Sequence, residues 1–203
     1  MDRERRKSIN RMTIHLAAVK LFSQRQYDEI TMDDIASEAH MSKRTVYKYF
    51  PSKISLASSV FETYMQEEYI AMSNAAKGCK TGKELVISSS RALYHFTKEN
   101  LQFMRLLWIL NDKVWGIEIP TEILDKIKTW NEALLDIGSE TIVSNDFHGP
   151  FAEFSPRKIN YFISAVNKGI FIEVQKIENQ GLTLSTTDEL FEIALAMYEK
   201  CLE

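Results

Sequence analysis

The sequence predicts an all-α protein, with a small three-helix domain at the N-terminus and a larger helical domain after it. Apolar residues recur at helical spacing over most of the chain. Only seven glycines and four prolines interrupt 203 residues, and a hydrophobic content of 45% is enough for a substantial core. The apolar runs lack the sustained alternation and the turn dipeptides of hairpins. We expect residues 1–52 to form the first domain, 53–77 a linking helix and 78–203 the second domain.

The first helix is predicted at about residues 8–25, because one face of that segment is apolar. Positions i, i+3, i+4, i+7 and i+8 share one stripe of a helix. We expect this stripe to pack against the two short helices that follow and to brace them. Its members are Ile14, Ala17, Ala18, Leu21 and Phe22.

Residues 31–53, TMDDIASEAHMSKRTVYKYFPSK, predict two short helices joined by a tight turn. Thr31 is a suitable N-cap for the first helix, and the acidic residues of the next turn favour the helix dipole. Ser42 is placed to cap the second helix, which is basic and aromatic, and Pro51 ends it. Two helices in this arrangement are typical of a device that reads double-stranded DNA.

The rest of the chain predicts longer helices. A fourth helix, at about 53–77, has one apolar face and is long enough to continue into the second domain. The segment KGCKTGK, at 77–83, has the glycine and lysine content of a helix end and a loop. Beyond it we expect helices at about 83–98, 99–111, 120–144, 156–180 and 186–203, with one long irregular connection at 143–156.

The charge is distributed unevenly along the chain. Residues 1–60 hold 11 Lys and Arg against 7 Asp and Glu, a net charge of +4, whereas the remainder holds 14 against 21, a net charge of −7. A basic first domain on an acidic body suits a nucleic-acid partner and would keep the second domain away from phosphates. The arm that carries Arg3, Arg5, Arg6 and Lys7 would add phosphate or minor-groove contacts, or would be a plain solvated tail.

Over residues 9–60 the chain resembles the TetR family of transcriptional regulators. Gln26 and His40 depart from the resemblance, because the family commonly has glycine at both positions. Histidine tolerates a positive φ better than most residues, so we expect the turn at His40 to persist. The matching segments are Ala17-Ala18, Leu21-Phe22, Tyr27-Asp28, Ile30-Thr31, Asp34-Ile35-Ala36, Ser42-Lys43, Thr45-Val46-Tyr47 and Tyr49-Phe50-Pro51-Ser52-Lys53.

A second short helix docked in the major groove would direct Lys43 and Arg44 toward guanine O6 and N7. By the resemblance, Tyr47 and Lys53 fall on positions where the family contacts the DNA backbone. The alternative is that the tyrosines pack between helices and that the cations form a solvated face. The predicted DNA-binding set is Thr31, Ser42, Lys43, Arg44, Thr45, Tyr47, Lys48, Tyr49 and Lys53.

The second domain is rich in large apolar side chains. One interpretation is a cavity between helices that binds an apolar or aromatic effector, since the family couples an inducer-binding domain to the DNA-binding domain. The other is that the same side chains fill an ordinary helical core. The predicted lining is Phe96, Phe103, Met104, Trp108, Trp115, Trp130, Phe162 and Asn167.

The last two helices carry more apolar surface than one core needs. A helix that is apolar on two faces needs two partners, so we expect these helices to pair with a second copy as a four-helix bundle. The alternative is a fully buried pair inside a monomer. The predicted dimer interface is Phe162, Val166, Gly169, Ile170, Phe191, Leu195 and Tyr198.

Enzyme and metal chemistry find little support in the sequence. Cys79 and Cys201 lack metal-ligand spacing, the four histidines are isolated, and no catalytic or nucleotide-binding motif is present, so no cofactor or metal is expected. The N-terminal segment is no signal peptide and no apolar run could span a membrane, which favours the cytoplasm. The prediction is a homodimeric repressor that a small molecule releases from a pseudo-palindromic DNA operator. The alternative is a helical small-molecule-binding or protein-interaction module that no longer reads DNA.

Overall fold

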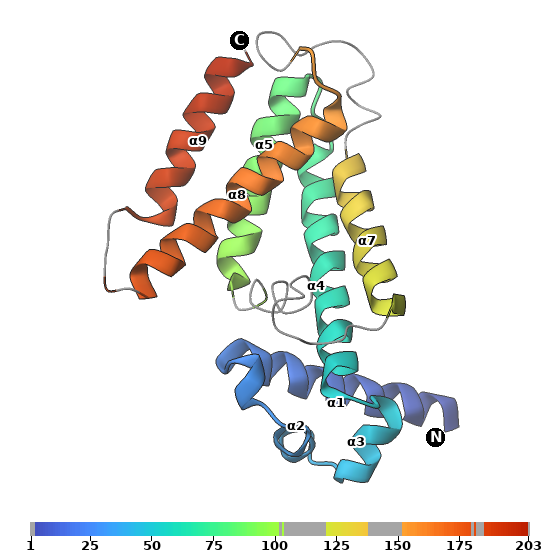
Figure 1. Ribbon diagram of the computed structural model, residues 1–203. Coiled ribbons are helices and arrows are strands. Elements are labelled where there is room, and N and C mark those ends of the chain that lie inside the picture. Colours follow the sequence, from blue (N-terminus) through green and yellow to red (C-terminus); the bar gives the residue numbers. More distant parts are fainter. Residues whose placement is uncertain are drawn as a thin grey trace. The chain divides into compact units, whose positions relative to one another are not determined.

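The computed structural model describes residues 3–101, 103, 121–137, 152–179, 181 and 185–202, and their regular elements are all helices, which confirms the all-α prediction (Figure 1). The predicted pocket residues Met104, Trp108 and Trp115 lie outside the described residues. So do most of the expected helix at 99–111 and most of the irregular connection at 143–156. The helices are α1 (Arg3–Gln24), η1 (Tyr27–Glu29), α2 (Met32–Glu38), α3 (Lys43–Tyr49), α4 (Lys53–Ala76), α5 (Gly82–Glu99), α7 (Thr121–Asp136), α8 (Pro156–Asn179) and α9 (Thr187–Cys201).

The chain divides into two compact units. The first unit comprises residues 1–66 and 100–128, and the second comprises 67–99 and 129–203. Helix α4 therefore contributes its first half to one unit and its second half to the other. Residues 77–81 of the glycine and lysine segment connect α4 to α5, and Gly78 has a φ of 86° there, whereas residues 82 and 83 begin α5. The three-part domain division expected from the sequence stays a prediction.

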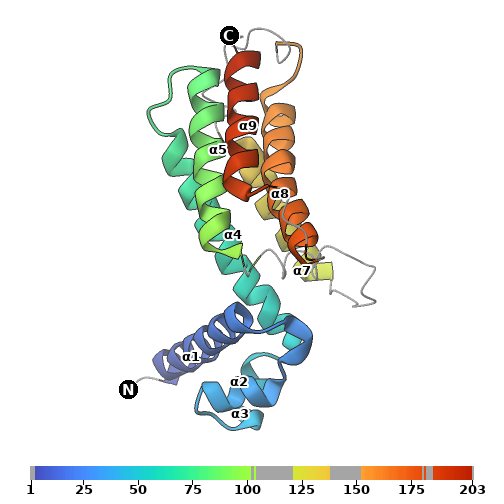
Figure 2. The ribbon, with the colours of Figure 1, turned by 90° about the vertical axis from the view of Figure 1, so that its left-hand side faces the viewer.

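The core of the first unit is built on the apolar stripe of α1. All five predicted stripe residues are buried, which confirms that prediction. Their counterparts on the short helices are Ile35 of α2 and Val46 of α3, both with no exposed surface. In Figure 2, α1, α2 and α3 lie together with the start of α4, and α2 contacts both α1 and α3. Burial of such stripes is the main force that holds these three helices in one arrangement.

The two short helices begin and end where the sequence predicts. The Thr31 hydroxyl accepts from the backbone N–H of Asp34 at 3.1 Å, and the Asp34 carboxylate accepts from the Thr31 N–H at 2.7 Å, which completes a capping box. Ser42 accepts from the Thr45 N–H at 3.2 Å. Both predicted N-caps are confirmed. His40 has a φ of 53°, so the turn keeps the left-handed conformation expected there. Gln26 has a φ of −68°, so its position does not require glycine.

The second unit contains a bundle in which α5, α8 and α9 contact one another (Figure 1). The Tyr94 ring of α5 stacks on Phe191 of α9, with 3.9 Å between ring centroids, and on Phe171 of α8 at 5.1 Å. The Tyr94 hydroxyl also donates to the Asp188 carboxylate at the start of α9. Thr186 caps that helix through a second capping box with Glu189. Among the described helices, none is long and apolar enough to cross a membrane.

Candidate nucleic-acid interface

Helix α3 has one buried face and one exposed face. Val46 is fully buried against the rest of the first unit, whereas Lys43, Arg44, Tyr47 and Lys48 are exposed. The seven residues of α3 make two turns, so a single inward position fixes which side chains face outward. Exposed cations and an exposed tyrosine on one short helix form a surface that is suited to phosphates and base edges.

The two cations at the start of α3 differ in their local partners. Lys43 Nζ lies 2.8 Å from the Asp33 carboxylate of α2, and this hydrogen bond raises the pKa of Lys43. An exposed ion pair of this kind contributes little stability, so a phosphate or a base can replace Asp33 at small cost. Among the described residues, Arg44 has no ion-pair partner, and its guanidinium is available for the bidentate contact that guanine offers.

Tyr49 faces the first helix rather than the outside. Its hydroxyl accepts from Asn10 Nδ2 at 3.1 Å, and its backbone carbonyl accepts from Arg11 at 3.4 Å. Arg11 also lies over the Phe50 ring, 4.5 Å from the centroid. These contacts tie the C-terminal end of α3 to α1. Tyr49 therefore orients the exposed helix, while Tyr47 is the tyrosine that projects outward.

Lys53, at the start of α4, is engaged within the unit. Its Nζ donates to the Tyr27 carbonyl at 2.8 Å and to the Ile30 carbonyl at 2.9 Å, and it lies 4.1 Å from the Tyr27 ring centroid. Burial lowers the pKa of Lys53 from its ordinary value. The resemblance implies a DNA contact for this lysine, whereas the structure gives it partners inside the protein. Sequence alone carries no sign of these two contacts, because both acceptors are backbone carbonyls, at the start of η1 and just after its end.

A basic pocket of about 300 Å³ lies where the N-terminal end of α1 meets α3. Four cationic side chains line it, and three polar side chains from the two helices complete it. Lys7 forms an ion pair with Glu4 at 2.6 Å, so its charge is largely balanced. The guanidinium groups of Arg3 and Arg6 and the ammonium group of Lys48 therefore make the pocket positively charged. The sequence left the basic arm undecided between contact and solvent. The lining residues are Arg3, Arg6, Lys7, Asn10, Thr45, Lys48 and Tyr49.

A tight turn followed by an N-capped, exposed helix defines a helix-turn-helix domain, the class in which the second helix enters the major groove. Residues 14–60 match the family model described as bacterial regulatory proteins of the tetR family. Residues 14–60 are thus a helix-turn-helix domain of the TetR type, and the resemblance found in the sequence is confirmed there.

Comparison with known proteins gives relatives of the same class. The HTH-type transcriptional activator FasR of Mycolicibacterium smegmatis is 24% identical over 122 residues, which cover 60% of this chain and 55% of that protein. The chain thus spans about half the length of that relative. The fold matches the fatty acid degradation regulator FadR of Bacillus halodurans, with a TM-score of 0.70, 15% identity and coverage of 96% of each chain. It also matches FadR of Bacillus subtilis in complex with stearoyl-CoA, with a TM-score of 0.66, 17% identity and coverage of 95% and 99%.

Of the predicted effector-binding residues that the structure describes, Phe103 belongs to the first unit and the others belong to the second. Phe103 belongs to the first unit and packs against Tyr64, with 5.5 Å between ring centroids. Trp130 belongs to the second unit, where it packs against Tyr69 at 5.9 Å. In that unit Phe96 is half-buried, Phe162 is exposed and Asn167 is buried. Their role in binding stays a prediction.

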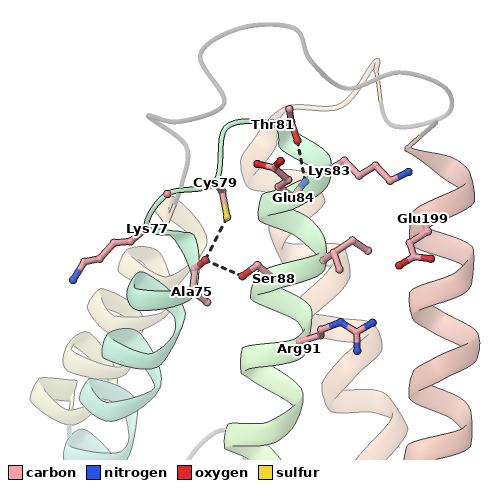
Figure 3. A pocket seen from close by; sticks show the side chains of 11 residues that line it. Ala75, Lys77, Cys79, Thr81, Lys83, Glu84, Ser88, Arg91 and Glu199 are labelled. Atoms are coloured by element: carbon pink, nitrogen blue, oxygen red, sulfur yellow. Dashed lines mark hydrogen bonds between the residues drawn. The ribbon is translucent and has the colours of Figure 1, made fainter.

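An open groove of about 820 Å³ lies in the second unit beside the connection between α4 and α5 (Figure 3). Cys79 Sγ and the Ser88 hydroxyl both donate to the Ala75 carbonyl, at 3.3 Å and 2.8 Å, which ties the end of α4 to α5. Lys83 and Arg91 extend along its side in Figure 3. None of the predicted effector-binding residues lines this groove.

Of the seven predicted dimer residues, three are buried, three are partly exposed and Phe162 is exposed. Phe191, Leu195 and Tyr198 are buried within a single chain, so they belong to the core of the second unit. Val166, Gly169 and Ile170 are partly exposed, and a Cβ placed on Gly169 would meet nothing within 4 Å. The large apolar side chains that α8 and α9 expose are Tyr161, Phe162, Ile193 and Met197.

Proposed function

We propose that the chain is a homodimeric DNA-binding transcriptional regulator, a repressor that a small molecule releases from a pseudo-palindromic operator. The observation that carries the proposal is the N-capped helix α3, whose exposed face combines Arg44, Lys43, Tyr47 and Lys48 beside the basic pocket. In this proposal residues 1–52 read DNA, 53–77 form the linking helix, and 78–203 bind the effector and dimerise. The proposed partners are therefore double-stranded DNA, an apolar or aromatic effector and a second copy of the chain.

The proposed docking assigns different tasks to the residues of the first unit. Arg44 and Lys43 reach base edges from the first turn of α3, where a major-groove helix comes closest to the bases. Tyr47, Thr45 and the backbone at Thr31 contact phosphates and set the register. The basic pocket places Arg6 and Lys48 beside the same surface, where they hold a further phosphate. Ser42 and Tyr49 act through the helix, by capping it and by tying it to α1.

Selection from a random duplex library, followed by gel retardation at several salt concentrations, tests whether the chain binds DNA in a sequence-specific way. Arg44→Ala should weaken binding to the selected site by about 1–3 kcal/mol and relax preference at one base pair in each half-site. Lys48→Ala should weaken all sequences alike and reduce the salt dependence by about one counterion. Lys128→Ala, at an exposed lysine of α7, is the matched control and should bind like the wild type. A chain that selects no sequence from the library would favour the alternative module that no longer reads DNA.

The exposed apolar residues of α8 and α9 support the homodimer. Tyr161, Phe162, Ile193 and Met197 lie on two helices that contact each other, and the open space at Gly169 permits close approach of another helix. Met197→Glu should give monomers, because pairing would bury an unpaired carboxylate. Lys200→Glu, an exposed position of the same helix, should leave the dimer intact. Sedimentation that finds unaltered dimers for Met197→Glu and for Ile193→Glu would reject this interface.

The effector proposal rests on the fold and on the solved relative that contains stearoyl-CoA. A long-chain acyl-CoA is therefore the first effector class to test for this chain. An effector that favours the arrangement unable to bind DNA lowers the affinity of the chain for its operator, typically by about 5- to 150-fold. Operator DNA then lowers the affinity of the chain for the effector by the same factor. Duplex retardation with and without stearoyl-CoA measures this factor. A reporter assay then separates repression from activation, the role named for the Mycolicibacterium smegmatis relative.

A further inference from the structure

Five buried side-chain polar atoms of the described chain have no hydrogen-bond partner, and all five belong to the second unit. Native proteins leave few such groups, because each has lost its water without gaining a replacement. Five in one helical unit therefore require an explanation. The atoms are Glu68 Oε2, Ser90 Oγ, Thr97 Oγ1, Asn167 Oδ1 and Tyr198 Oη.

Two of these groups, Asn167 of α8 and Ser90 of α5, meet each other, and a third, Glu68 of α4, contacts the residue that follows Asn167. Asn167, 1% exposed, extends its Nδ2 toward the Ser90 carbonyl of α5 at 3.5 Å, the outer limit of a hydrogen bond. Ser90 itself is fully buried. The next residue of α8, Lys168, lies 3.3 Å from Glu68 Oε1 of α4, and Glu68 is only 1% exposed. Two adjacent positions on α8 thus meet buried polar groups from α4 and from α5.

These polar groups interrupt apolar stripes. Asn167 stands one helical turn from Ile163 and one turn from Phe171, both buried on the same face of α8. Ser90 likewise stands one turn from Val86 and one turn from Tyr94 on the buried face of α5. Two facing helices that contact each other therefore place a polar residue in the middle of otherwise apolar packing. Apolar residues of similar shape would pack there without the desolvation cost, so these polar groups suit a ligand that supplies their missing partners.

The unpartnered atoms specify the chemistry of a ligand. Glu68 Oε2 and Asn167 Oδ1 accept hydrogen bonds and cannot donate, and the Ser90 hydroxyl can do either. The amide orientation of Asn167 follows from its neighbour, because only the NH₂ group can face the Ser90 carbonyl. Lys168 already faces Glu68, so it leaves no net positive charge for an anion. The complementary molecule is apolar and carries a neutral group that donates hydrogen bonds.

We infer that Asn167, Ser90 and Glu68 form the polar anchor of the effector site, and that the effector carries a hydroxyl or amide N–H head on an apolar body. This inference rests on the proposed effector response. A fatty alcohol supplies the donor through its hydroxyl, whereas an acyl-CoA supplies it through the amide N–H groups of its pantetheine arm. A free fatty acid, ionised at neutral pH, supplies no donor. Apolar ligands with a few placed polar contacts are typical of pockets between helices.

The test compares three probes of equal chain length, 1-dodecanol, lauroyl-CoA and dodecanoate, by thermal shift of the full chain. At least one of the first two should raise the melting temperature, and dodecanoate should not. Asn167→Leu and Ser90→Ala should melt at or above the wild-type temperature without ligand, should bind the selected duplex as before, and should need at least about tenfold more ligand for the same shift. Thr97→Val is the matched control. It removes another buried unpartnered hydroxyl of α5, about 10 Å along the helix from Ser90, and should respond like the wild type.

Each outcome decides the inference separately from the proposed function. The anchor is overturned if Asn167→Leu and Ser90→Ala show the same ligand-induced thermal shift as the wild type. It is also overturned if dodecanoate is the only probe that shifts the wild-type melting temperature, or if no probe shifts it. Lower ligand-free stability of both variants with an unchanged response assigns the residues a structural role and also overturns it. If Asn167→Leu fails to fold, Ser90→Ala carries the test by itself. A ligand shift that depends on the anchor, in a chain that selects no duplex, would support the anchor and reject the DNA-binding function.

Discussion

Replacing Lys53 by methionine separates a structural role for this lysine from the DNA contact that the resemblance implies. Methionine keeps an unbranched apolar side chain of similar length and removes only the ammonium group. The change deletes two hydrogen bonds from a charged donor, to the Tyr27 and Ile30 carbonyls, and the contact with the Tyr27 ring. The substitution therefore removes the side-chain contacts that connect the start of α4 to residues 27–30.

The expected cost follows from these contacts. A hydrogen bond to a charged group contributes about 1.5–3 kcal/mol, and a cation over an aromatic ring about 0.5–1 kcal/mol at a partly exposed site. Two factors reduce the sum: burial of the ammonium opposes its charged state, as the lowered pKa of Lys53 indicates, and both carbonyls can take up water in the variant. We expect Lys53→Met to lower the free energy of unfolding by about 2–3 kcal/mol in all.

Urea unfolding of the DNA-free chain, followed by circular dichroism and by hydrogen exchange of the amides of α2, measures this loss. Lys48→Met is the matched variant, because Lys48 is an exposed lysine at the basic pocket. It should change stability by less than about 0.5 kcal/mol and should weaken duplex binding. Unchanged unfolding of Lys53→Met, together with a uniform loss of affinity for all duplexes, would refute the structural role and favour a phosphate contact.

Two further predictions concern the first unit. His40→Gly should stabilise the chain by about 0.5–1 kcal/mol in urea unfolding, because a φ of 53° strains a residue that has a Cβ; no change or a loss would mean that the histidine side chain stabilises the turn. His15 bonds the Ser59 hydroxyl through Nδ1 at 2.8 Å, and burial lowers its pKa. The unfolded chain therefore binds the proton first, so the melting temperature should fall as pH drops through about 6.5, and His15→Gln should flatten this fall. An equal fall in that variant would assign it to other groups.

The sequence was sufficient for the first unit because the signals there are local. A hydroxyl at an N-cap bonds an amide three residues later, and an apolar stripe repeats with the helical turn, so Thr31, Ser42 and the stripe of α1 could be assigned without knowledge of distant residues. The same periodicity found most of the longer helices. The spacing of apolar residues shows which face of a helix is buried, but it does not show which other helix packs against that face. The lining of an effector site could therefore not be assigned from the sequence.

Lys53, Tyr49 and the buried groups of α8 show what the sequence could not supply. Lys53 binds two carbonyls 26 and 23 residues away, and Tyr49 bonds Asn10 across 39 residues. Nor could the sequence show that Phe191 of α9 is buried within its own chain, where its ring stacks on Tyr94.

The sequence by itself thus determined most of the described helices, the caps of α2 and α3, the left-handed turn at His40 and the TetR type of residues 14–60, since each depends on neighbours within a few turns. Only the tertiary structure decided which cations remain exposed, which apolar residues face outward, and which buried polar atoms lack partners. The physical reason is that burial and hydrogen bonding of a side chain depend on segments brought together by packing, whose distance along the chain no local pattern records.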